Sequence, residues 1–283
     1  MREVYGGGET AVLSGVILMN IEEILALYDE QERVQSKHPS YRWEVTPEVV
    51  RSIAHRPERH SFIMYSRLNE ANADAVIQRE LDYYRSTGGA GLEWKLYEHD
   101  EPADLGERLI AHGFVPDQQE GLLVLDLQEL PEVYKRPVTG DGRYHIHRLI
   151  TPEEISHVVQ VQAQVYDRDF SQLQTELEEN LAVEPDGWAI YAAYVDGQPV
   201  CGSWASFPQN SSFAGLWGGA TVEKYRQQGL YSQMVAIRAQ EAIARGYRFL
   251  TVYAGDMSRP ILLKRGFRPL THTYLYLWQP EEK

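Results

Sequence analysis

The stretch from Leu216 to Tyr231 constrains the fold of this chain more than any other part of the sequence. It begins with apolar residues, passes through a polar turn that contains Gly229, and leads into a strongly helical segment from Ser232 to Arg245. Backbone N–H groups at the start of such a helix lack partners within the helix, and the helix dipole adds positive character there. Glycine leaves room for an anion to approach the backbone. The stretch therefore predicts a binding site for the phosphates of a ligand, most simply a pyrophosphate.

The same residues do not fit two other phosphate-binding patterns. The Walker pattern ends in Gly-Lys-Ser or Gly-Lys-Thr, which is absent here, and the dinucleotide fingerprint requires three glycines where this turn has only Gly229. Taken alone, the six residues from Arg226 to Tyr231 also allow a simpler interpretation, namely a tight turn before a helix that binds nothing.

Length and composition limit the class of protein. The chain has 283 residues, which corresponds to about two domains of ~150 residues, and 43% apolar residues are enough for packed cores. The formal net charge of −14 argues against a nucleic-acid partner, which needs a basic footprint. The single cysteine, Cys201, excludes disulfides within the chain, and the nine histidines show no metal-ligand spacing. No metal is therefore expected.

Two further features bear on the location of the protein. No apolar run approaches the length of a membrane span. The N-terminus lacks the charged start and the cleavage pattern of a signal peptide. We therefore expect a cytoplasmic protein that has no membrane partner.

The sequence is expected to divide into two domains, 1–130 and 143–283, because the polar segment 131–142 contains prolines and glycines typical of a linker. In the first domain, Asn20 with Glu23 forms a capping box that predicts a helix start, and Thr46-Pro47-Glu48 predicts a second one.

From Arg143 onward the patterns predict a strand, two helices, three strands, a helix, a strand, a helix and a final strand. Thr151-Pro152-Glu153-Glu154 is a capping box that starts the first of these helices. Asp196-Gly197 separates two apolar runs and predicts a hairpin.

The turn from Arg226 to Tyr231 resembles the [RQ]-x-x-G-x-[GA] signature of the GNAT superfamily of N-acetyltransferases, although Tyr231 stands where glycine or alanine is usual. The element order from Arg143 and the Lys264-Arg265-Gly266-Phe267 run are similar to that family over about half the chain. The resemblance implies a mixed α/β sheet with helices on both faces, and acetyl-CoA as co-substrate. It also implies that an acetyl group is moved to an amine acceptor.

The first half of the sequence repeats the end of the second. His112-Gly113-Phe114-Val115-Pro116 and Arg265-Gly266-Phe267-Arg268-Pro269 both follow a short helix and precede an apolar strand. This echo predicts two GNAT-like domains in tandem. In the first copy, the segment before the helix near Asn69 has no glycine, and Glu70 and Asp74 would repel a phosphate. The first domain is therefore expected to have lost its cofactor site and to serve packing, substrate enclosure or contacts in a homodimer.

The resemblance implies a set of cofactor-binding residues. Backbone groups of the strand before the turn would bind the pantetheine arm, and N–H groups of the turn and the helix start would bind the pyrophosphate, with charge added by Arg226. These residues are Ala220, Thr221, Val222, Arg226, Gln227, Gln228, Gly229, Leu230, Tyr231 and Ser232.

The catalytic groups are less clear, because Leu262 stands where many family members have a tyrosine that protonates the leaving thiolate. Tyr253 and Asp256 are the alternative acids, although a strand aromatic and a helix cap are simpler interpretations of each. An alkylamine with a pKa near ~10.4 needs a base, and the base candidates are Glu223, Asp167 and Asp169.

Asp167 and Asp169 lie on a loop where family members contact the acceptor, and Trp204 and Trp217 on neighbouring strands are expected either to line the acceptor pocket or to pack in the core. We expect a small amine as acceptor, with a protein N-terminus or lysine as an alternative. Three other functions stay open: a non-catalytic protein that binds or senses acyl-CoA, a structural or dimerisation module, and transfer of a different acyl group.

Overall fold

The structure is a computed structural model that describes residues 19–87, 89–136 and 142–280. It is a mixed α/β fold, and the elements described here have the following bounds. The helices are α1 (Ile21–Tyr28), α2 (Ala73–Thr87), α3 (Leu105–Ala111), α4 (Glu132–Lys135), α5 (Pro152–Tyr166), α6 (Ser171–Val183), α7 (Leu230–Ala244) and α8 (Arg259–Leu263), with a π-helical segment, η1 (Asp29–Gln35), and 3₁₀ turns η2 (Leu127–Glu129) and η3 (Glu223–Tyr225). The strands are β1 (Tyr41–Val45), β2 (Val49–Ala54), β3 (Ser61–Ser66), β4 (Leu92–Tyr97), β5 (Val115–Asp126), β6 (His145–Leu149), β7 (Trp188–Val195), β8 (Gln198–Ser206), β9 (Phe213–Thr221), β10 (Phe249–Ala254) and β11 (Arg268–Trp278).

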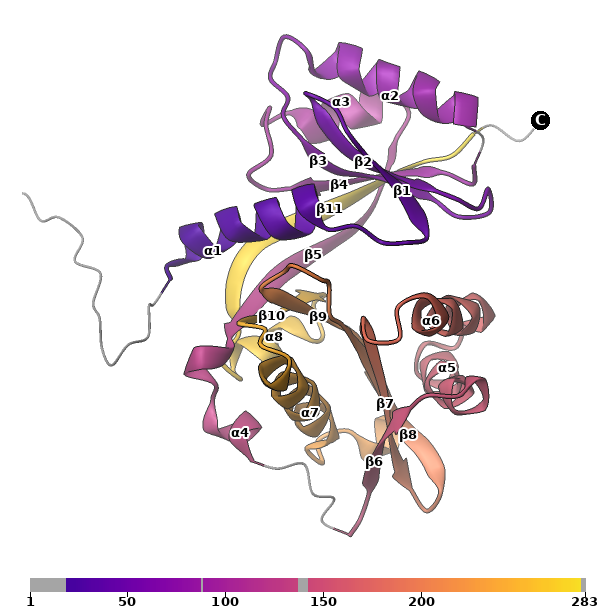
Figure 1. The fold of residues 1–283 in the computed structure, drawn as a ribbon, viewed down its shortest axis with the longest axis vertical. Helices are drawn as coiled ribbons and strands as arrows, with labels where there is room; N and C mark the ends of the chain where they lie inside the picture. The colour runs from indigo at the N-terminus through magenta and orange to yellow at the C-terminus, as the bar shows by residue number, and fades with distance from the viewer. Residues whose placement is uncertain (1–18, 88, 137–141, 281–283) are drawn as a thin grey trace, which may run out of the picture.

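These strands form one sheet in the order β1-β2-β3-β4-β11-β5-β10-β9-β8-β7-β6. Each half of the chain contributes one parallel pair, β3 with β4 and β9 with β10. The last strand of each half then pairs with the other half. β5 follows β4 in the chain but pairs with β10, and β11 follows β10 but pairs with β4. In Figure 1, β5 and β11 run as long curved strands through the middle of the molecule, between the two halves.

The exchanged strands carry core residues into the opposite half. Trp278 of β11 is buried among the residues that α2 and α3 pack against the first part of the sheet. Leu123 and Leu125 of β5 are buried in the cluster beneath α7 in the second half. Each half therefore has a hydrophobic core that is completed by a strand from the other half.

Helices cover both faces of the sheet. In the second half, α7 lies on one face and α5 and α6 lie on the other (Figure 1), with Met234 and Val158 buried in the respective cores. The N-terminal helix α1 packs Ile24 and Tyr28 onto strands of both halves, against Phe213 and Leu122 among others. Mixed strands with helices on two faces agree with the predicted fold class.

Several local predictions are confirmed. The capping boxes at Asn20 and Thr151 are both present, with Glu23 and Glu154 as the reciprocal acceptors. The Asp196-Gly197 turn joins β7 to β8 with positive φ at both residues, as a tight hairpin turn requires.

The helix predicted at Thr46-Pro47-Glu48 is wrong. These residues form the turn between β1 and β2, in which Thr46 Oγ1 accepts the N–H groups of Glu48 and Val49. A threonine that precedes proline caps a turn as readily as a helix. Here the β-branched residues Val49 and Val50 favour a strand over a helix, and both are fully buried in the sheet.

The tandem arrangement appears as two similar sets of strands in one sheet. The domain boundaries at 130 and 143 stay a prediction, and residues 137–141 of the expected linker lie outside the described residues.

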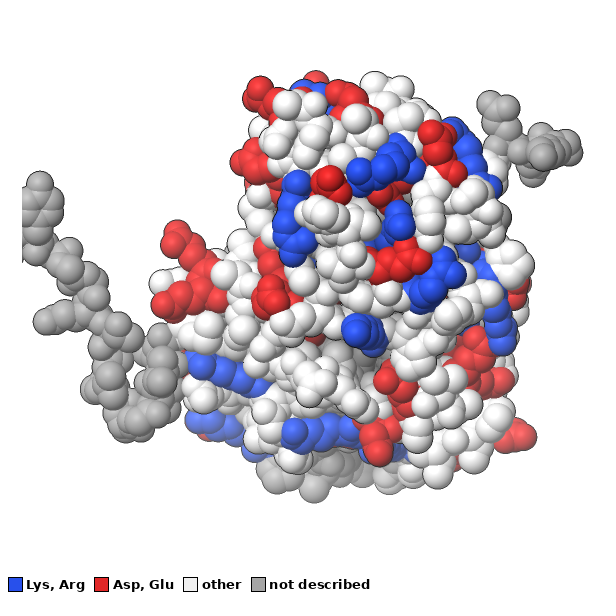
Figure 2. All heavy atoms as spheres, turned by 45° about the horizontal axis from the view of Figure 1, so that its top comes forward, with Lys and Arg blue, Asp and Glu red and all other residues white. Residues whose placement is uncertain are grey.

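Figure 2 shows acidic and basic side chains interspersed over one face of the molecule. Within the described ranges, no helix is long and apolar enough to cross a membrane.

We predict that the strand exchange makes the two halves depend on one another. A fragment of residues 143–283 lacks β5 and leaves an edge of β10 unpaired, so we expect it to aggregate or to associate with itself. A chain cut between residues 136 and 142 is expected to stay together, because β5 and β11 remain paired. Size-exclusion chromatography with circular dichroism tests both. A monomeric 143–283 fragment with cooperative unfolding would contradict the prediction.

Candidate functional site

The turn before α7 leaves backbone donors free. Gln227 and Gly229 both have positive φ, 61° and 85°, and Gly229 occupies the N-cap position, where it offers no side-chain hydrogen bond. A Cβ added at Gly229 would meet no atom within 4 Å. Within the described part of the chain, the N–H groups of Leu230, Tyr231 and Ser232 donate to no protein acceptor. The turn therefore presents unpartnered donors and open space, which suits an anion.

The corresponding helix of the first half is already capped. The side chain of Asn69 accepts the N–H groups of Ala71 and Asn72 at 2.9 and 3.1 Å, and its carbonyl accepts that of Ala73. Asp74 in the first turn pairs with Arg108. The N-terminus of α2 thus has protein partners and acidic charge where that of α7 has neither, so only α7 is suited to bind a phosphate.

Strands β9 and β10 separate in front of this turn. Their parallel pairing ends at Gly215 and Thr251, while β9 continues to Thr221 alongside β8. Beyond Gly215, β9 therefore has no strand partner on its β10 side over Ala220 and Thr221. Backbone groups that face such a gap are available to an extended ligand.

A β-bulge in β9 shapes this gap. Between Ala220 and Trp217 the register shifts by one residue, and a Cβ at Gly218 would lie 1.8 Å from the Trp204 ring. A Cβ at Gly219 would lie 2.9 Å from the Tyr231 ring. The Tyr231 ring thus packs over Gly219, and the missing side chain of this glycine leaves room for a large residue at position 231.

Two buried side chains donate hydrogen bonds to backbone carbonyls at the bulge. Gln162 of α5 donates to the carbonyl of Gly218. Arg238 of α7 donates from Nη1 to the carbonyls of Trp204 and Trp217, at 3.0 and 3.3 Å. Burial lowers the pKa of Arg238 to about 10, which still leaves it charged at neutral pH.

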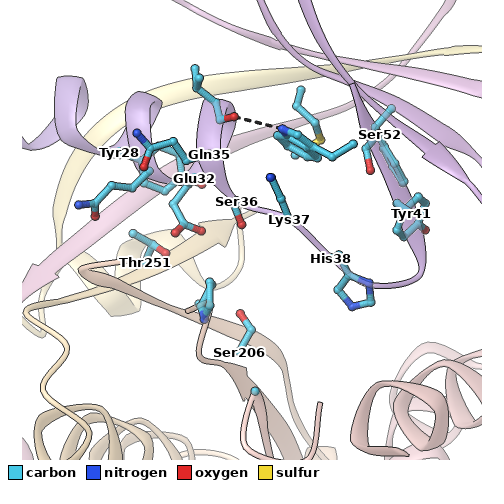
Figure 3. Close-up of a pocket in the computed structure, with 18 of the residues that line it drawn as sticks. Tyr28, Glu32, Gln35, Ser36, Lys37, His38, Tyr41, Ser52, Ser206 and Thr251 are labelled. Atoms are coloured by element: carbon cyan, nitrogen blue, oxygen red, sulfur yellow. Dashed lines mark hydrogen bonds between the residues drawn. The ribbon is translucent and has the colours of Figure 1, made fainter. Parts of the chain in front are cut away.

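The separated strands open onto a cavity of about 1360 Å³ between the two halves. Figure 3 shows side chains of η1, the segment that follows it, and the strands of both halves directed into this space. Its walls are largely aromatic, with polar groups between the rings. The aromatic residues are Tyr28, Tyr41, Trp43, Phe62, Tyr97, Trp188, Phe207, Trp217 and Tyr253.

Tyr253 is enclosed by groups from the first half. Its hydroxyl lies 2.8 Å from that of Tyr28 and 2.7 Å from that of Tyr97. Its ring lies 5.8 Å from the ring of Trp217, centroid to centroid. Burial raises the pKa of Tyr253 well above its ordinary value, so the hydroxyl stays protonated and can donate one hydrogen bond while it accepts another.

Lys95 of β4 lies over the ring of Tyr253, with Nζ 3.2 Å from the centroid. Within the described residues, Nζ makes no hydrogen bond and no ion pair. Burial lowers the pKa of Lys95 to about 8, although the negative charges of Glu120 and Glu93 act to raise it. A lysine that faces a cavity with this pKa can exchange a proton near neutral pH.

Of the residues named from the sequence, Tyr253 and Trp217 line the cavity. Trp204 packs beside the bulge against the core of α5 and α6. Leu262 is fully buried and carries no proton to donate. The others lie on exposed turns and do not line the cavity. They are Asp167 at the end of α5, Asp169, whose carboxylate accepts from Ser171, Glu223 in η3, and Asp256 before α8. Their catalytic or substrate roles stay predictions.

The cofactor residues lie together along the gap and the turn. The side chain of Arg226 is directed back to the carbonyl of Thr221, at 3.0 Å, and Gln228 donates to the carbonyl of Lys224. Their contribution to an anion site would come chiefly from the backbone. Sequence reasoning missed Lys95, Tyr97 and Tyr28, because each lies in the half that lacks the phosphate turn. The alternation of Glu93, Lys95 and Tyr97 in one strand was the available signal.

Similarity to known proteins is found in the structure and not in the sequence. No family model matches the chain, and no curated protein matches it. The structure is similar to a GCN5-related N-acetyltransferase from Kribbella flavida, with a TM-score of 0.65 at 18% identity over 92% of this chain and 95% of that one.

Two further solved structures are similar over most of the chain. One is a tandem GNAT protein from the clavulanic acid biosynthesis pathway, with a TM-score of 0.59 at 12% identity over 94% of this chain and 90% of that one. The other is a GCN5-related N-acetyltransferase from Sphaerobacter thermophilus, with a TM-score of 0.59 at 11% identity over 93% and 87%. The chain therefore has the GNAT fold across nearly its whole length. Within the described ranges, no group of His, Cys, Asp and Glu side chains is arranged to hold a metal ion.

We predict that Lys95 titrates near pH 8. The chain has only six lysines, so ¹³C-dimethylation gives a resolvable set of NMR signals. One of these is expected to titrate near pH 8 because burial disfavours the ammonium form, and to be absent from the Lys95→Arg variant. If every lysine signal of the wild-type protein titrated above pH 10, the cavity would be far better hydrated than its lining indicates.

Proposed function

We propose that the protein is an N-acetyltransferase that uses acetyl-CoA as donor and a small amine as acceptor. The GNAT fold supports acyl-CoA-dependent acyl transfer in general. The observation that carries the finer proposal is the order of three features along the chain: the cavity at Trp217, the part of β9 that has no β10 partner, and the free N–H groups at the start of α7.

The residues of these three features fit the parts of acetyl-CoA. In this proposal the pyrophosphate would be bound by the turn and the helix start, and the pantetheine arm by the last residues of β9 and Val222. The first group is Gln227, Gln228, Gly229, Leu230, Tyr231 and Ser232, and the second is Ala220, Thr221 and Val222. The acyl end would then lie near Trp217 and Tyr253, where the gap meets the cavity. The aromatic walls and the free cavity volume accommodate an amine with an apolar body.

Acyl transfer forms a C–N bond between the amine and the thioester carbon and breaks the C–S bond. The ammonium loses two protons overall, one before attack and one that ends on the coenzyme A sulfur. Tyr253 retains its proton at neutral pH and is placed to deliver one to the sulfur, with Tyr28 and Tyr97 able to replace it. In this assignment Tyr253 protonates the leaving thiolate, which the apolar side chain of Leu262 cannot do.

A non-catalytic acyl-CoA-binding protein is the second candidate, favoured by the buried Leu262 in place of a proton donor. Another acyl group in place of acetyl is compatible with the same three features. A cytoplasmic location belongs to the proposal, supported by a single cysteine that is buried and free.

We predict that Gly229→Glu abolishes binding of acetyl-CoA, measured by calorimetric titration, because a carboxylate would occupy the phosphate position. Gly246→Glu is the matched control, since Gly246 has the same φ of 85° and open surroundings at the other end of α7. Both variants place a side chain at positive φ, a cost of ~1 kcal/mol. Equal binding by the two variants, or two sites in the wild-type chain, would contradict a single site at α7.

We predict that Tyr253→Phe lowers kcat for acetyl transfer by ~10²-fold and leaves the affinity for acetyl-CoA unchanged, because it removes one proton donor and retains the ring beneath Lys95. Steady-state kinetics with free thiol detection tests this. Tyr194→Phe is the control, because Tyr194 bonds to His157 outside the cavity. An unchanged kcat in Tyr253→Phe would show that the thiolate leaves without help from this residue.

A further inference from the structure

Glu32 has an unusual setting among the charged groups of the cavity. It belongs to η1, a π-helical segment that continues α1 and runs from Asp29 to Gln35. Its carboxylate accepts a hydrogen bond from Ser211 Oγ. Within the described residues, no lysine, arginine or histidine lies within ion-pair distance of it. π-Helical segments are rare and are frequently found at functional sites.

Two neighbouring charged residues of η1, Asp29 and Arg33, have ion-pair partners, in contrast to Glu32. Arg33 is almost completely buried, donates twice to Asp100 at 2.9 and 2.7 Å, and pairs with Asp29 at 2.9 Å. Its guanidinium also lies over the Tyr97 ring, 3.7 Å from the centroid. Arg33 thus fixes η1 to the end of β4. The residue before it, Glu32, is directed away from this network.

Glu32 lines the same cavity as Gly215 and Thr251, the last paired residues of β9 and β10, and its hydrogen bond lies at the other end of that pairing. Its partner Ser211 comes two residues before Phe213, where the pairing of β9 with β10 begins. Tyr28, one turn earlier on the same helix, lies 2.8 Å from the hydroxyl of Tyr253. Figure 3 shows the Glu32 side chain extending from η1 toward Thr251, the last residue of the parallel pairing.

We propose that Glu32 is the general base of this protein, so that the first half of the chain supplies a catalytic residue to the acetyl-CoA site of the second half. The proposal rests on the proposed acetyl transfer. The Glu32 carboxylate takes one proton from the acceptor ammonium and later releases it to solvent. The neutral amine nitrogen then forms the C–N bond as the C–S bond breaks, and its second proton ends on the sulfur.

The protonation behaviour of Glu32 suits this role. Burial raises its pKa to about 7, so that it accepts a proton readily yet is substantially ionised at neutral pH. The titratable groups that face it are Tyr28 from α1 and Tyr247 from the segment before β10. Burial raises the pKa of both tyrosines, so they stay neutral while Glu32 titrates. Arg33 and His99 are occupied by Asp29 and Asp100.

The other carboxylates of the cavity are less suitable. Glu93 is held by His60 Nδ1 at 2.5 Å, on β4. Glu184 lies after α6, beside Gly187 and Trp188, at the part of the cavity formed by the start of β7. Glu32 differs from both in two respects: it has no charged partner among the described residues, and it lies one turn after Tyr28, whose hydroxyl contacts that of Tyr253.

The test compares two amines that differ in their need for a base. Phenethylamine is a protonated alkylamine at neutral pH, whereas aniline is a weak base and is already neutral there. For Glu32→Gln, we expect kcat/KM for phenethylamine to fall ~10²-fold and the rate with aniline to change little. In the wild type, kcat/KM for phenethylamine is expected to rise through pH 7 as Glu32 loses its proton, and this rise should be absent from the variant.

Glu22→Gln, an exposed acid on α1, is the matched control and is expected to behave as the wild type. A second readout needs no acceptor. Because the pKa of Glu32 is raised in the folded state, the wild type loses stability relative to Glu32→Gln as the pH rises from about 4.5 to 7, so the difference in Tm should grow over this range.

The outcomes separate the two proposals. Wild-type transfer to phenethylamine with an unchanged pH profile in Glu32→Gln would overturn the role of Glu32 and leave acetyl transfer standing. A parallel loss with both amines would show that Glu32 positions the acceptor and is not the base. Wild-type protein that binds acetyl-CoA but acetylates neither amine would overturn the proposed function, and the role of Glu32 with it.

Discussion

The exchange of β5 and β11 is the constraint on which the rest of the structure depends. A strand gains its stability from backbone hydrogen bonds on both sides, and each exchanged strand obtains them from the opposite half, β5 from β10 and β11 from β4. The two strands also pair with each other. As a result, the two halves share one sheet and cannot move apart without breaking a ladder in each. The cavity between them is therefore enclosed by fixed strands of both halves, as preorganised chemistry requires.

This arrangement explains how a half without a phosphate site can still matter for chemistry. The start of α2 is capped by the Asn69 side chain and carries acidic residues, whereas three successive N–H groups at the start of α7 donate to no acceptor among the described residues. Strand β4 of the first half is nevertheless separated from β10 by two strands, β11 and β5. β5 and β11 run as curved strands between the two halves (Figure 1). Lys95 and Tyr97 of β4 contact Tyr253 of β10. Free N–H groups are thus found at the start of α7 in the second half, while the cavity is lined by residues of both halves.

Sequence reasoning reached the features that depend on local chemistry. Capping boxes, the Asp196-Gly197 hairpin and the glycine turn at Gly229 are set by a few adjacent residues, and the structure has all of them. The turn at Thr46 was mistaken for a helix start because the deciding factor is burial of Val49 in the sheet, which the local pattern does not contain. The exchange of β5 and β11 was beyond reach for the same reason, since both strands end in an apolar run and either run could pair with β4 or β10. Lys95 and Glu32 were missed because their importance arises only when segments from both halves meet around Tyr253.

The electrostatics of the cavity follow from which charges have partners. Arg33 is placed between Asp29 and Asp100, and Glu93 beside His60, so these charges are compensated and their positions fixed. Lys95 and Glu32 have no ion-pair partner among the described residues, and burial moves both pKa values toward neutrality, in opposite directions. Desolvation without a charged partner is costly for stability, and it occurs at these two groups of the cavity as well as at Arg238, whose partners are backbone carbonyls. A fold that neutralises its structural charges and leaves these two uncompensated has a cavity suited to moving protons rather than to binding a fixed ion.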